Sequence, residues 1–329
     1  MPTPMKSGEI LRDRYRIERI IGQGGMGSIY LADDLRLQGR LCALKEVQHD
    51  TSLSSDLIKQ ARDQFQREAT VLARLDHPNL PKVSDFFSNS GRDYLVMDYV
   101  PGKDLRTLMF EVRKKSEFLP EADVINWASQ LSDALSYLHQ QDPPILHRDV
   151  KPSNLKLTPS GMVKLVDFGL VKILASDDVT ITILQGRGTA LYTPLEQYGG
   201  DTGHTDARSD IYAFGATLYH LLTNKAPIEA RELFLDPEML IPPRQLNPHI
   251  RVRTERAILW AMNLHPDERP QSIDEFREAL LGNKEPTLVR RSAPHQYRRD
   301  EFLVSPIDRV LAVVAVGVFL FSLALTLLS

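Results

Sequence analysis

The spacing of apolar residues changes near residue 99 of this 329-residue chain, and this change constrains the fold more than any other feature. Before it, apolar residues alternate in short runs, which predicts strands. These runs are 15–21, 29–31, 41–47 and 94–99. One longer segment between them, 53–75, has the three- and four-residue spacing of an amphipathic helix.

After residue 99 the helical spacing dominates. Apolar residues recur every three or four positions in four further segments, which are 124–138, 211–222, 257–262 and 273–281. A strand-rich part followed by a helical part predicts the α+β class. We therefore expect two lobes that meet near residue 99.

A run of 19 residues without a charge, 310–328, distinguishes the end of the chain. At about 1.5 Å per residue, a helix of this length approaches the ~30 Å of a bilayer core. A buried core helix is the alternative. The preceding segment, 283–309, has three prolines and six basic against four acidic residues, which predicts a juxtamembrane linker on the cytoplasmic side. We expect a single-pass, C-terminal membrane anchor behind a cytoplasmic domain.

The composition excludes several classes of protein. With 42% hydrophobic and 25% charged residues, the chain is neither disordered nor fibrous. A net charge of −3 gives no reason to expect nucleic acid as a partner. The single cysteine, Cys42, excludes an intramolecular disulfide, and we expect it to be a small buried side chain.

A glycine string, GQGGMG at 22–27, has the spacing G-x-G-x-x-G. Dinucleotide-binding folds use the same string, but there a helix follows it. Here residues 28–31 continue as a strand. The glycines are therefore expected at the tip of a hairpin, where backbone N–H groups can approach phosphates, and an ordinary turn is the alternative.

Two charged residues stand among apolar neighbours. Lys45 lies on the strand predicted at 41–47, and Glu68 shares the apolar face of the 53–75 helix. A carboxylate that faces a core needs a cation. We therefore predict an ion pair between Lys45 and Glu68. For Lys45, exposure on the far face of the sheet is the alternative.

The segment 147–154, HRDVKPSN, packs four ionisable residues and an asparagine between apolar stretches. A short strand at 163–166 is followed by Asp167. Together Asp149, Asn154 and Asp167 supply the hard oxygen atoms that suit Mg²⁺ and phosphate chemistry. A surface loop with chance charges is the alternative.

These motifs resemble those of the eukaryotic-type (Hanks-type) Ser/Thr protein kinases, above all the bacterial membrane-associated branch. The glycine string, AxK at 43–45, HRDxKxxN and DFG at 167–169 follow the order of that family, over about residues 12–282. The resemblance implies a bilobal protein-kinase fold, with an N-lobe at 12–98 and a C-lobe at 99–282. It also implies transfer of the ATP γ-phosphate to serine or threonine of protein substrates, with Mg²⁺.

The resemblance assigns roles residue by residue. Asp149 would orient the substrate hydroxyl, and Lys151 would neutralise the transferred phosphoryl group. Asn154 and Asp167 would bind Mg²⁺. Lys45, held by Glu68, would contact the nucleotide phosphates. The rest of the ATP site would comprise Gly22, Gln23, Gly24, Gly25, Met26, Gly27, Ile29, Ala43, Asp98, Val100 and Asp104.

Other matching positions are expected to be structural. Asp210 would brace the 147–154 loop, and Glu196 would pair with Arg269. At 194–196 the chain has PLE where the family has APE, which leaves the geometry of the substrate-side loop open.

Regulation is expected in the segment between Gly169 and Glu196. Arg148 could receive a phosphate there, and Thr180 and Thr182 are the best acceptors. Plain loop residues are the alternative for both threonines. The anchor would concentrate molecules in the membrane and promote trans-autophosphorylation. Two other functions stay open, a nucleotide-binding signalling scaffold with dispensable catalysis and a kinase for small molecules.

Overall fold

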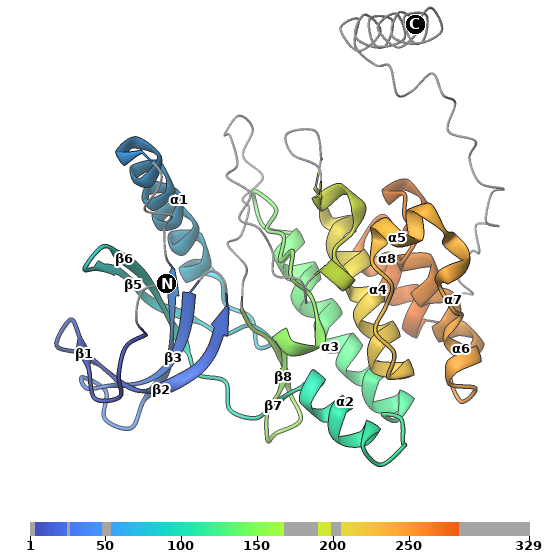
Figure 1. Ribbon diagram of the computed structural model, residues 1–329, viewed down its shortest axis with the longest axis horizontal. Helices are drawn as coiled ribbons and strands as arrows, with labels where there is room; N and C mark the ends of the chain where they lie inside the picture. The colour runs from blue at the N-terminus through green and yellow to red at the C-terminus, as the bar shows by residue number, and fades with distance from the viewer. Residues whose placement is uncertain (1–3, 25–26, 48–53, 168–189, 199–204, 283–329) are drawn as a thin grey trace, which may run out of the picture. The chain divides into compact units, whose positions relative to one another are not determined.

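The first hundred residues fold around an antiparallel sheet of six strands in the order β1-β2-β3-β4-β6-β5 (Figure 1). The computed structural model describes residues 4–24, 27–47, 54–167, 190–198 and 205–282. The strands are Ile10–Leu11 (β1), Tyr15–Gly24 (β2), Gly27–Asp34 (β3), Leu41–Val47 (β4), Val83–Asn89 (β5) and Arg92–Asp98 (β6). All four predicted runs lie on these strands, whereas β5 was not predicted because its sequence, VSDFFSN, does not alternate cleanly.

A single long helix, α1 (Ser55–Arg74), packs against β5. Its first turn is capped by Ser54, whose side chain accepts a hydrogen bond from the backbone N–H of Leu57. The predicted apolar face is confirmed, because Phe65 and Leu72 are both buried. This packing positions Glu68, which lies on the same face.

The second part of the chain is helical, with a small three-stranded sheet. The helices are α2 (Leu105–Arg113), α3 (Glu121–His139), α4 (Ala207–Thr223), α5 (Ala230–Leu235), α6 (Pro243–Leu246), α7 (Val252–Ala261) and α8 (Ile273–Leu281). The strands are β7 (Lys103–Asp104), β8 (Leu155–Leu157) and β9 (Val163–Leu165). Short 3₁₀ turns are η1 (Pro152–Asn154), η2 (Ala190–Tyr192), η3 (Leu195–Gln197), η4 (Pro237–Met239) and η5 (Pro266–Glu268).

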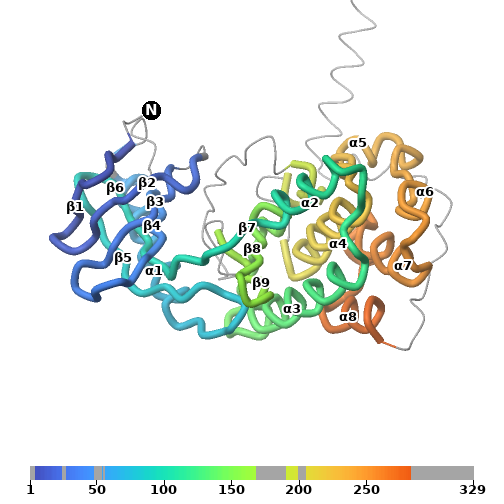
Figure 2. Tube along the Cα trace, turned by 90° about the horizontal axis from the view of Figure 1, so that it is seen from below, coloured from blue at the N-terminus to red at the C-terminus, as the bar shows by residue number. Residues whose placement is uncertain are grey.

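Helix α4 is the centre of this part, and α2, α3, α6, α7 and α8 all contact it (Figure 2). It is buried on nearly every side, and its few polar side chains, such as Asp210 and Thr217, are buried with it. The carboxylate of Asp206 caps its first turn by accepting from the N–H of Arg208 at 2.8 Å. Asn224, in the left-handed region at φ 56°, ends it.

One apolar cluster runs through both parts, from Ala43 and Phe65 to Leu280. A second cluster covers the other face of the sheet and includes Cys42, which is fully buried as predicted. The described residues fall in one compact unit, and the predicted α+β class with its strand-rich and helical lobes is confirmed.

Among the residues that the structure describes, no helix is both long enough and apolar enough to cross a membrane. The predicted linker and anchor, 283–309 and 310–328, lie outside those residues.

Candidate active site

The glycine string lies on a hairpin, as predicted. Strands β2 and β3 pair through Gly22–Ile29, Gln23–Ser28 and Gly24–Gly27. Gly25 and Met26, which join the two strands, lie outside the described residues. No helix follows the string, which excludes the dinucleotide-binding arrangement.

Gly27 is required by both its backbone and its surroundings. Its φ is +136°, and a Cβ atom placed on it would lie 2.2 Å from the carbonyl oxygen of Glu46 on β4. Any side chain would therefore push the end of the hairpin away from the sheet. Glycine at this position keeps the hairpin close to the strand that carries Lys45.

Lys45 lies on β4, between Ile29 of β3 and Leu95 of β6, with a side chain that is only 11% exposed. It is therefore not on an exposed far face. Its Nζ forms a hydrogen-bonded ion pair with Oδ1 of Asp167, a residue 122 positions away. Burial alone would raise the pKa of Asp167, but the charge and hydrogen bond of Lys45, with Lys151, hold it below its ordinary value.

The predicted ion pair between Lys45 and Glu68 does not form in this structure, and we correct it here. Within the described residues, Glu68 accepts a hydrogen bond from Nε2 of Gln64 at 3.0 Å, and Lys45 bonds Asp167 instead. Burial raises the pKa of Glu68 to about 7, against the lowering effects of Gln64 and of the charge of Arg148. Lys45 therefore pairs with the carboxylate of Asp167, and Glu68 is left with Gln64 as its side-chain hydrogen-bond partner within the described residues.

The 147–154 loop brings three of the predicted residues together. Lys151 Nζ donates to Oδ2 of Asp149 at 2.7 Å, and Asn154 Nδ2 donates to the same oxygen at 2.9 Å and to the backbone carbonyl of Asp149 at 2.8 Å. The other carboxylate oxygen, Oδ1, is buried and has no hydrogen-bond partner in the described part of the chain. A buried acceptor of this kind is costly unless something binds it.

Asp210 braces this loop from α4, as predicted. Its side chain is fully buried and accepts the backbone N–H groups of His147 at 2.8 Å and Arg148 at 2.7 Å. It also shares a hydrogen bond of 2.9 Å with Nε2 of His139. Burial would raise the pKa of Asp210, but these donors keep it below its ordinary value. An ionised carboxylate thus fixes the backbone that leads into Asp149.

Two residues of the site have left-handed backbone conformations without being glycine. Arg148 has φ 62° and Asp167 has φ 58°. Such conformations cost about 1–3 kcal/mol each and persist only where the surroundings impose them. Asp210 imposes the first. Beside the second, the backbone N–H of Val166 donates to the backbone carbonyl of Asn154 at 2.8 Å. This hydrogen bond holds the residue before Asp167 against the 147–154 loop.

The residues predicted to line the adenine site share the apolar interior of the sheet. Ala43 of β4 pairs with Met97 of β6, and both are buried, as is Val100. Ile29 packs against the same cluster from β3. The carboxylate of Asp98 is held by Nη2 of Arg40 at 3.1 Å. These contacts place the end of β6 and the segment after it at the edge of the apolar surface.

Asp104 has a structural partner of its own. Its carboxylate caps α2 by accepting the N–H of Thr107 at 2.8 Å and the Thr107 hydroxyl at 3.0 and 3.1 Å. Its contact with a ribose stays a prediction.

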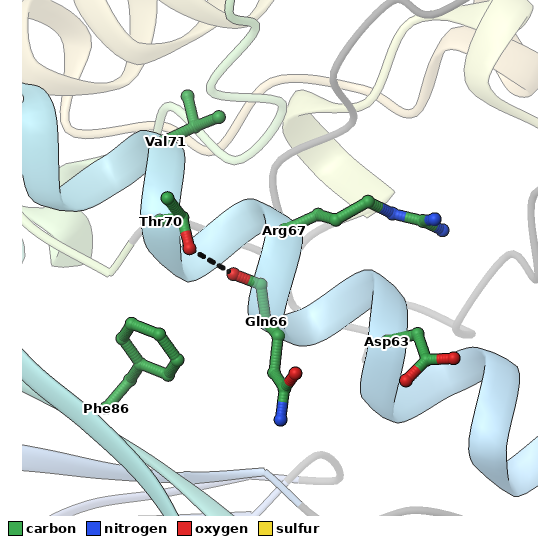
Figure 3. A pocket seen from close by; sticks show the side chains of 6 residues that line it. All are labelled: Asp63, Gln66, Arg67, Thr70, Val71 and Phe86. Atoms are coloured by element: carbon green, nitrogen blue, oxygen red, sulfur yellow. Dashed lines mark hydrogen bonds between the residues drawn. The ribbon is translucent and has the colours of Figure 1, made fainter.

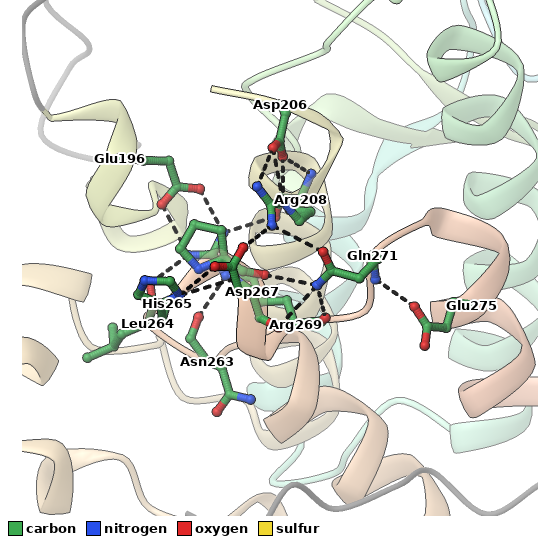
Figure 4. A network of polar contacts seen from close by, with 11 residues as sticks. Glu196, Asp206, Arg208, Asn263, Leu264, His265, Asp267, Arg269, Gln271 and Glu275 are labelled. Carbon is green, nitrogen blue, oxygen red and sulfur yellow. Dashed lines mark hydrogen bonds and ion pairs between the residues drawn. The ribbon is translucent and has the colours of Figure 1, made fainter. Parts of the chain in front are cut away.

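The predicted pair between Glu196 and Arg269 is confirmed, and the structure adds a network around it (Figure 4). The two side chains bond at 2.7 and 3.1 Å, and Ser209 Oγ donates to Glu196 at 2.7 Å. Arg269 is fully buried and also donates to the backbone carbonyls of Asn263, Leu264 and Arg208. Its partners fix the segment 190–198 against the helical part.

Two contributors to the site had no clear signal in the sequence. His139 holds Asp210, and Thr217 on α4 donates its hydroxyl to the carbonyl of Val150 at 3.2 Å. A hydroxyl in the middle of a buried helix could have indicated Thr217.

An open hollow beside α1 is separate from these residues (Figure 3). It is lined by Asp63, Gln66, Arg67, Thr70, Val71 and Phe86. None of the residues predicted for nucleotide, metal or catalysis lines it.

Several predicted residues lie outside the described part of the chain. They are Gly25, Met26, Phe168, Gly169, Thr180 and Thr182.

The oxygen atoms of the site suit Mg²⁺. Among the described residues, no group of three or more His, Cys, Asp or Glu side chains could hold a metal alone. Mg²⁺ in phosphate sites needs only one or two protein ligands, because phosphates and water complete its shell. The carboxylate of Asp167 and the amide oxygen of Asn154, whose Nδ2 is already committed to Asp149, fit that requirement.

The protein family described as the protein kinase domain matches residues 15–270. The chain is 34% identical over 283 residues to a probable serine/threonine-protein kinase of Clostridium acetobutylicum, a match that covers 84% of this chain and 41% of that protein. It is 33% identical over 320 residues to the serine/threonine-protein kinase pkn3 of Myxococcus xanthus, covering 92% and 56% respectively. A third match, the serine/threonine-protein kinase PknB of Mycobacterium leprae, is 33% identical over 283 residues and covers 82% and 43%.

Solved structures give the same result. The kinase domain of Mycobacterium tuberculosis PknI superposes with a TM-score of 0.62 at 29% identity, and the match covers 84% of this chain and 98% of that one. PpkA in its apo form gives 0.66 at 27% identity, with 84% and 99% covered. The chain spans only about half the length of the curated relatives it matches.

Proposed function

Because the chain belongs to the protein kinase family, we propose that it transfers the γ-phosphoryl group of ATP to serine and threonine hydroxyls of protein substrates. The observation that carries the proposal is the set of hydrogen bonds made by the carboxylate of Asp149. Lys151 and Asn154 bind one of its carboxylate oxygens, and the other is buried without a partner among the described residues. We infer that this oxygen accepts the hydrogen of a substrate hydroxyl.

In the proposed reaction, the substrate oxygen forms a bond to the γ-phosphorus while the bond to the ADP oxygen breaks. The hydroxyl proton passes to Oδ1 of Asp149. Lys151, which lies 2.7 Å from Oδ2 of Asp149, neutralises charge on the transferred group. The chain mainly contributes position and electrostatics, because the phosphoryl group needs little covalent help.

Nucleotide binding is proposed for the glycine hairpin and the apolar surface of Ile29 and Ala43. Lys45 would contact the phosphates, and Asn154 and Asp167 would hold the metal. Bound Mg²⁺ would supply charge neutralisation between the β- and γ-phosphates. Lys45 must then release Asp167 in order to contact phosphate oxygens.

The choice of serine and threonine as acceptors is supported by Lys151, two positions after Asp149, and by relatives whose names are those of Ser/Thr kinases.

The test uses the full chain with ATP, Mg²⁺ and a generic protein acceptor. Mass spectrometry of the acceptor should find phosphoserine or phosphothreonine, which Lys45→Ala and Asp149→Asn should abolish while Arg36→Ala, on an exposed turn, leaves it unchanged. Binding of ATP without transfer would favour the nucleotide-binding scaffold. Transfer to a sugar or amino acid but to no protein would favour a small-molecule kinase.

We further propose that one copy of the chain phosphorylates a second copy at Thr180 or Thr182, in the segment between Gly169 and Glu196. The support is the position of Arg148 beside Asp149 and its partial burial in the site. Phosphate on either threonine in the wild type, and its absence in Asp149→Asn, is the expected result. Phosphate on both proteins would show that another kinase is responsible.

Residues 310–328 are proposed to anchor the chain in a membrane, with the kinase domain on the cytoplasmic side. The support is the run of 19 uncharged residues and the basic flank before it. The full chain should stay in the membrane fraction after alkaline extraction, and a variant that ends at residue 309 should not. Equal release of both proteins would contradict the proposal.

A further inference from the structure

Helix α2 and the four residues after it carry a net positive charge. Between Leu105 and Glu117 there are four basic and two acidic residues. One of the acidic residues, Glu111, is already bonded to Lys103 at 2.7 and 2.9 Å. The segment from Leu105 to Glu117 therefore keeps a net positive charge.

Two of the basic residues share a face of α2. Arg106, Phe110 and Arg113 have the spacing i, i+4 and i+7, which places them in one row. All three are exposed, Phe110 by 55%. Within the described residues neither the side chain of Arg106 nor that of Arg113 forms a hydrogen bond or an ion pair. We call this row the α2 face.

The α2 face lies beside a buried contact between η2 and α4. Tyr192 Oη and His220 Nδ1 share a hydrogen bond of 2.6 Å. Burial, followed by the positive charges of Arg106 and Arg113, lowers the pKa of His220 to about 4. Burial raises the pKa of Tyr192 to about 12, although Arg106 opposes this. Both groups are neutral near pH 7, so neither offsets the two arginines.

This location is next to the site of chemistry. Helix α2 packs against η1, which contains Asn154, and against α4, which carries His220 (Figure 2). Tyr192 is four residues before Glu196, in the segment that Arg269 fixes to the helical part. A polypeptide that presents its hydroxyl to Asp149 would thus have its flanking residues within reach of the α2 face.

We propose that the α2 face binds acidic side chains that flank the phosphorylated residue, so that the chain selects acidic protein substrates. The inference rests on the proposed kinase function and specifies its substrate class. Arg106 and Arg113 supply the charge, and Phe110 supplies an apolar surface between them for the stems of glutamate side chains.

The experiment measures kcat/KM of the full chain on three threonine peptides that differ only in flanking glutamate, glutamine or lysine residues. The proteins are the wild type, Arg106→Ala/Arg113→Ala, Arg106→Glu/Arg113→Glu and Arg36→Ala. Arg36 is a matched control because it is an exposed arginine on the turn after β3, without a side-chain hydrogen bond or ion pair within the described residues.

The wild type and Arg36→Ala should prefer the glutamate peptide over the glutamine peptide. Each arginine should contribute about two- to fivefold, as exposed ion pairs do, and the preference should shrink at high salt. The alanine variant should lose the preference while keeping its activity on the glutamine peptide. The glutamate variant should prefer the lysine peptide.

Equal rates on glutamate and glutamine peptides, or a preference that survives in the alanine variant, would overturn the inference and leave the kinase proposal intact. Transfer to no peptide would overturn the kinase proposal and this inference with it. If the alanine variant folds poorly, the test rests on Arg106→Glu/Arg113→Glu. A folding defect lowers the rates on all three peptides and cannot create a new preference for the lysine peptide.

Discussion

Replacement of Arg269 by methionine tests how the substrate-side segment is held. Its guanidinium group is fully buried, bonds both carboxylate oxygens of Glu196, and lies 5.0 Å from the ring centre of Tyr212. Methionine has a similar volume but cannot pair with the carboxylate. The change therefore leaves a largely buried negative charge without its cation (Figure 4).

Removal of one partner from a buried pair costs about 3–5 kcal/mol. For a domain of this size, each kcal/mol lowers Tm by about 2–4 °C, so Arg269→Met should melt about 6–20 °C below the wild type. The control is Arg208→Met in the same network. Arg208 pairs with Asp206 and Asp267, whose side chains are 38% and 72% exposed, so its loss should cost at most about 1 kcal/mol.

The assay is thermal denaturation followed by circular dichroism, repeated for Glu196→Gln and for the double variant. Because Arg269 and Glu196 interact directly, the double variant should lose less free energy of unfolding than the two single variants lose together. Burial would raise the pKa of Glu196, but Arg269 and then Ser209 hold it below its ordinary value. The contribution of the pair should therefore be present above about pH 4.5 and be lost as the pH falls further. An Arg269→Met protein as stable as the wild type, or an Arg208→Met protein that is less stable than Arg269→Met, would contradict this expectation.

Three further predictions concern the site. Burial raises the pKa of Glu68 to about 7, so between pH 4.5 and 7 the folded state binds a proton that the unfolded state has lost. The free energy of unfolding should therefore fall by about 3 kcal/mol between pH 4.5 and 7.5. Urea unfolding at several pH values should show this fall for the wild type but not for Glu68→Gln. Gly27→Ala, whose Cβ would meet the Glu46 carbonyl at 2.2 Å, should lower Tm and ATP affinity more than Gly39→Ala, which has a positive φ but open space; equal losses would contradict the close approach. Asp210→Asn should reduce kcat more than tenfold with little change in the KM for ATP, and an unchanged kcat would show that the brace is dispensable.

Local sequence patterns predicted the parts of the fold that depend on local rules. Alternation located β2, β3, β4 and β6, and helical spacing located α1 and the longer helices to within a few residues. The helix α2 and the strand β5 were not predicted, because both are short and their positions depend on packing against α4 and α1. The pair between Glu196 and Arg269 came from the family resemblance.

Contacts between distant elements could not be read from the sequence. Two carboxylates compete for Lys45, and the choice of Asp167 over Glu68 depends on where α1 lies relative to the sheet. In the same way, nothing in the sequence showed that Arg106 on α2 would lie beside His220 on α4. These arrangements follow from tertiary packing, which motif order does not encode.

The role of Asp149 is the central claim, and single-turnover kinetics test it most directly. The full chain would be saturated with ATP and Mg²⁺ and mixed with a threonine peptide, after ATP affinity has been measured separately for the wild type and Asp149→Asn. We expect similar ATP affinities and a transfer rate that is at least about 100-fold lower in the variant. Equal transfer rates, or loss of ATP binding as the whole cause of the defect, would contradict it.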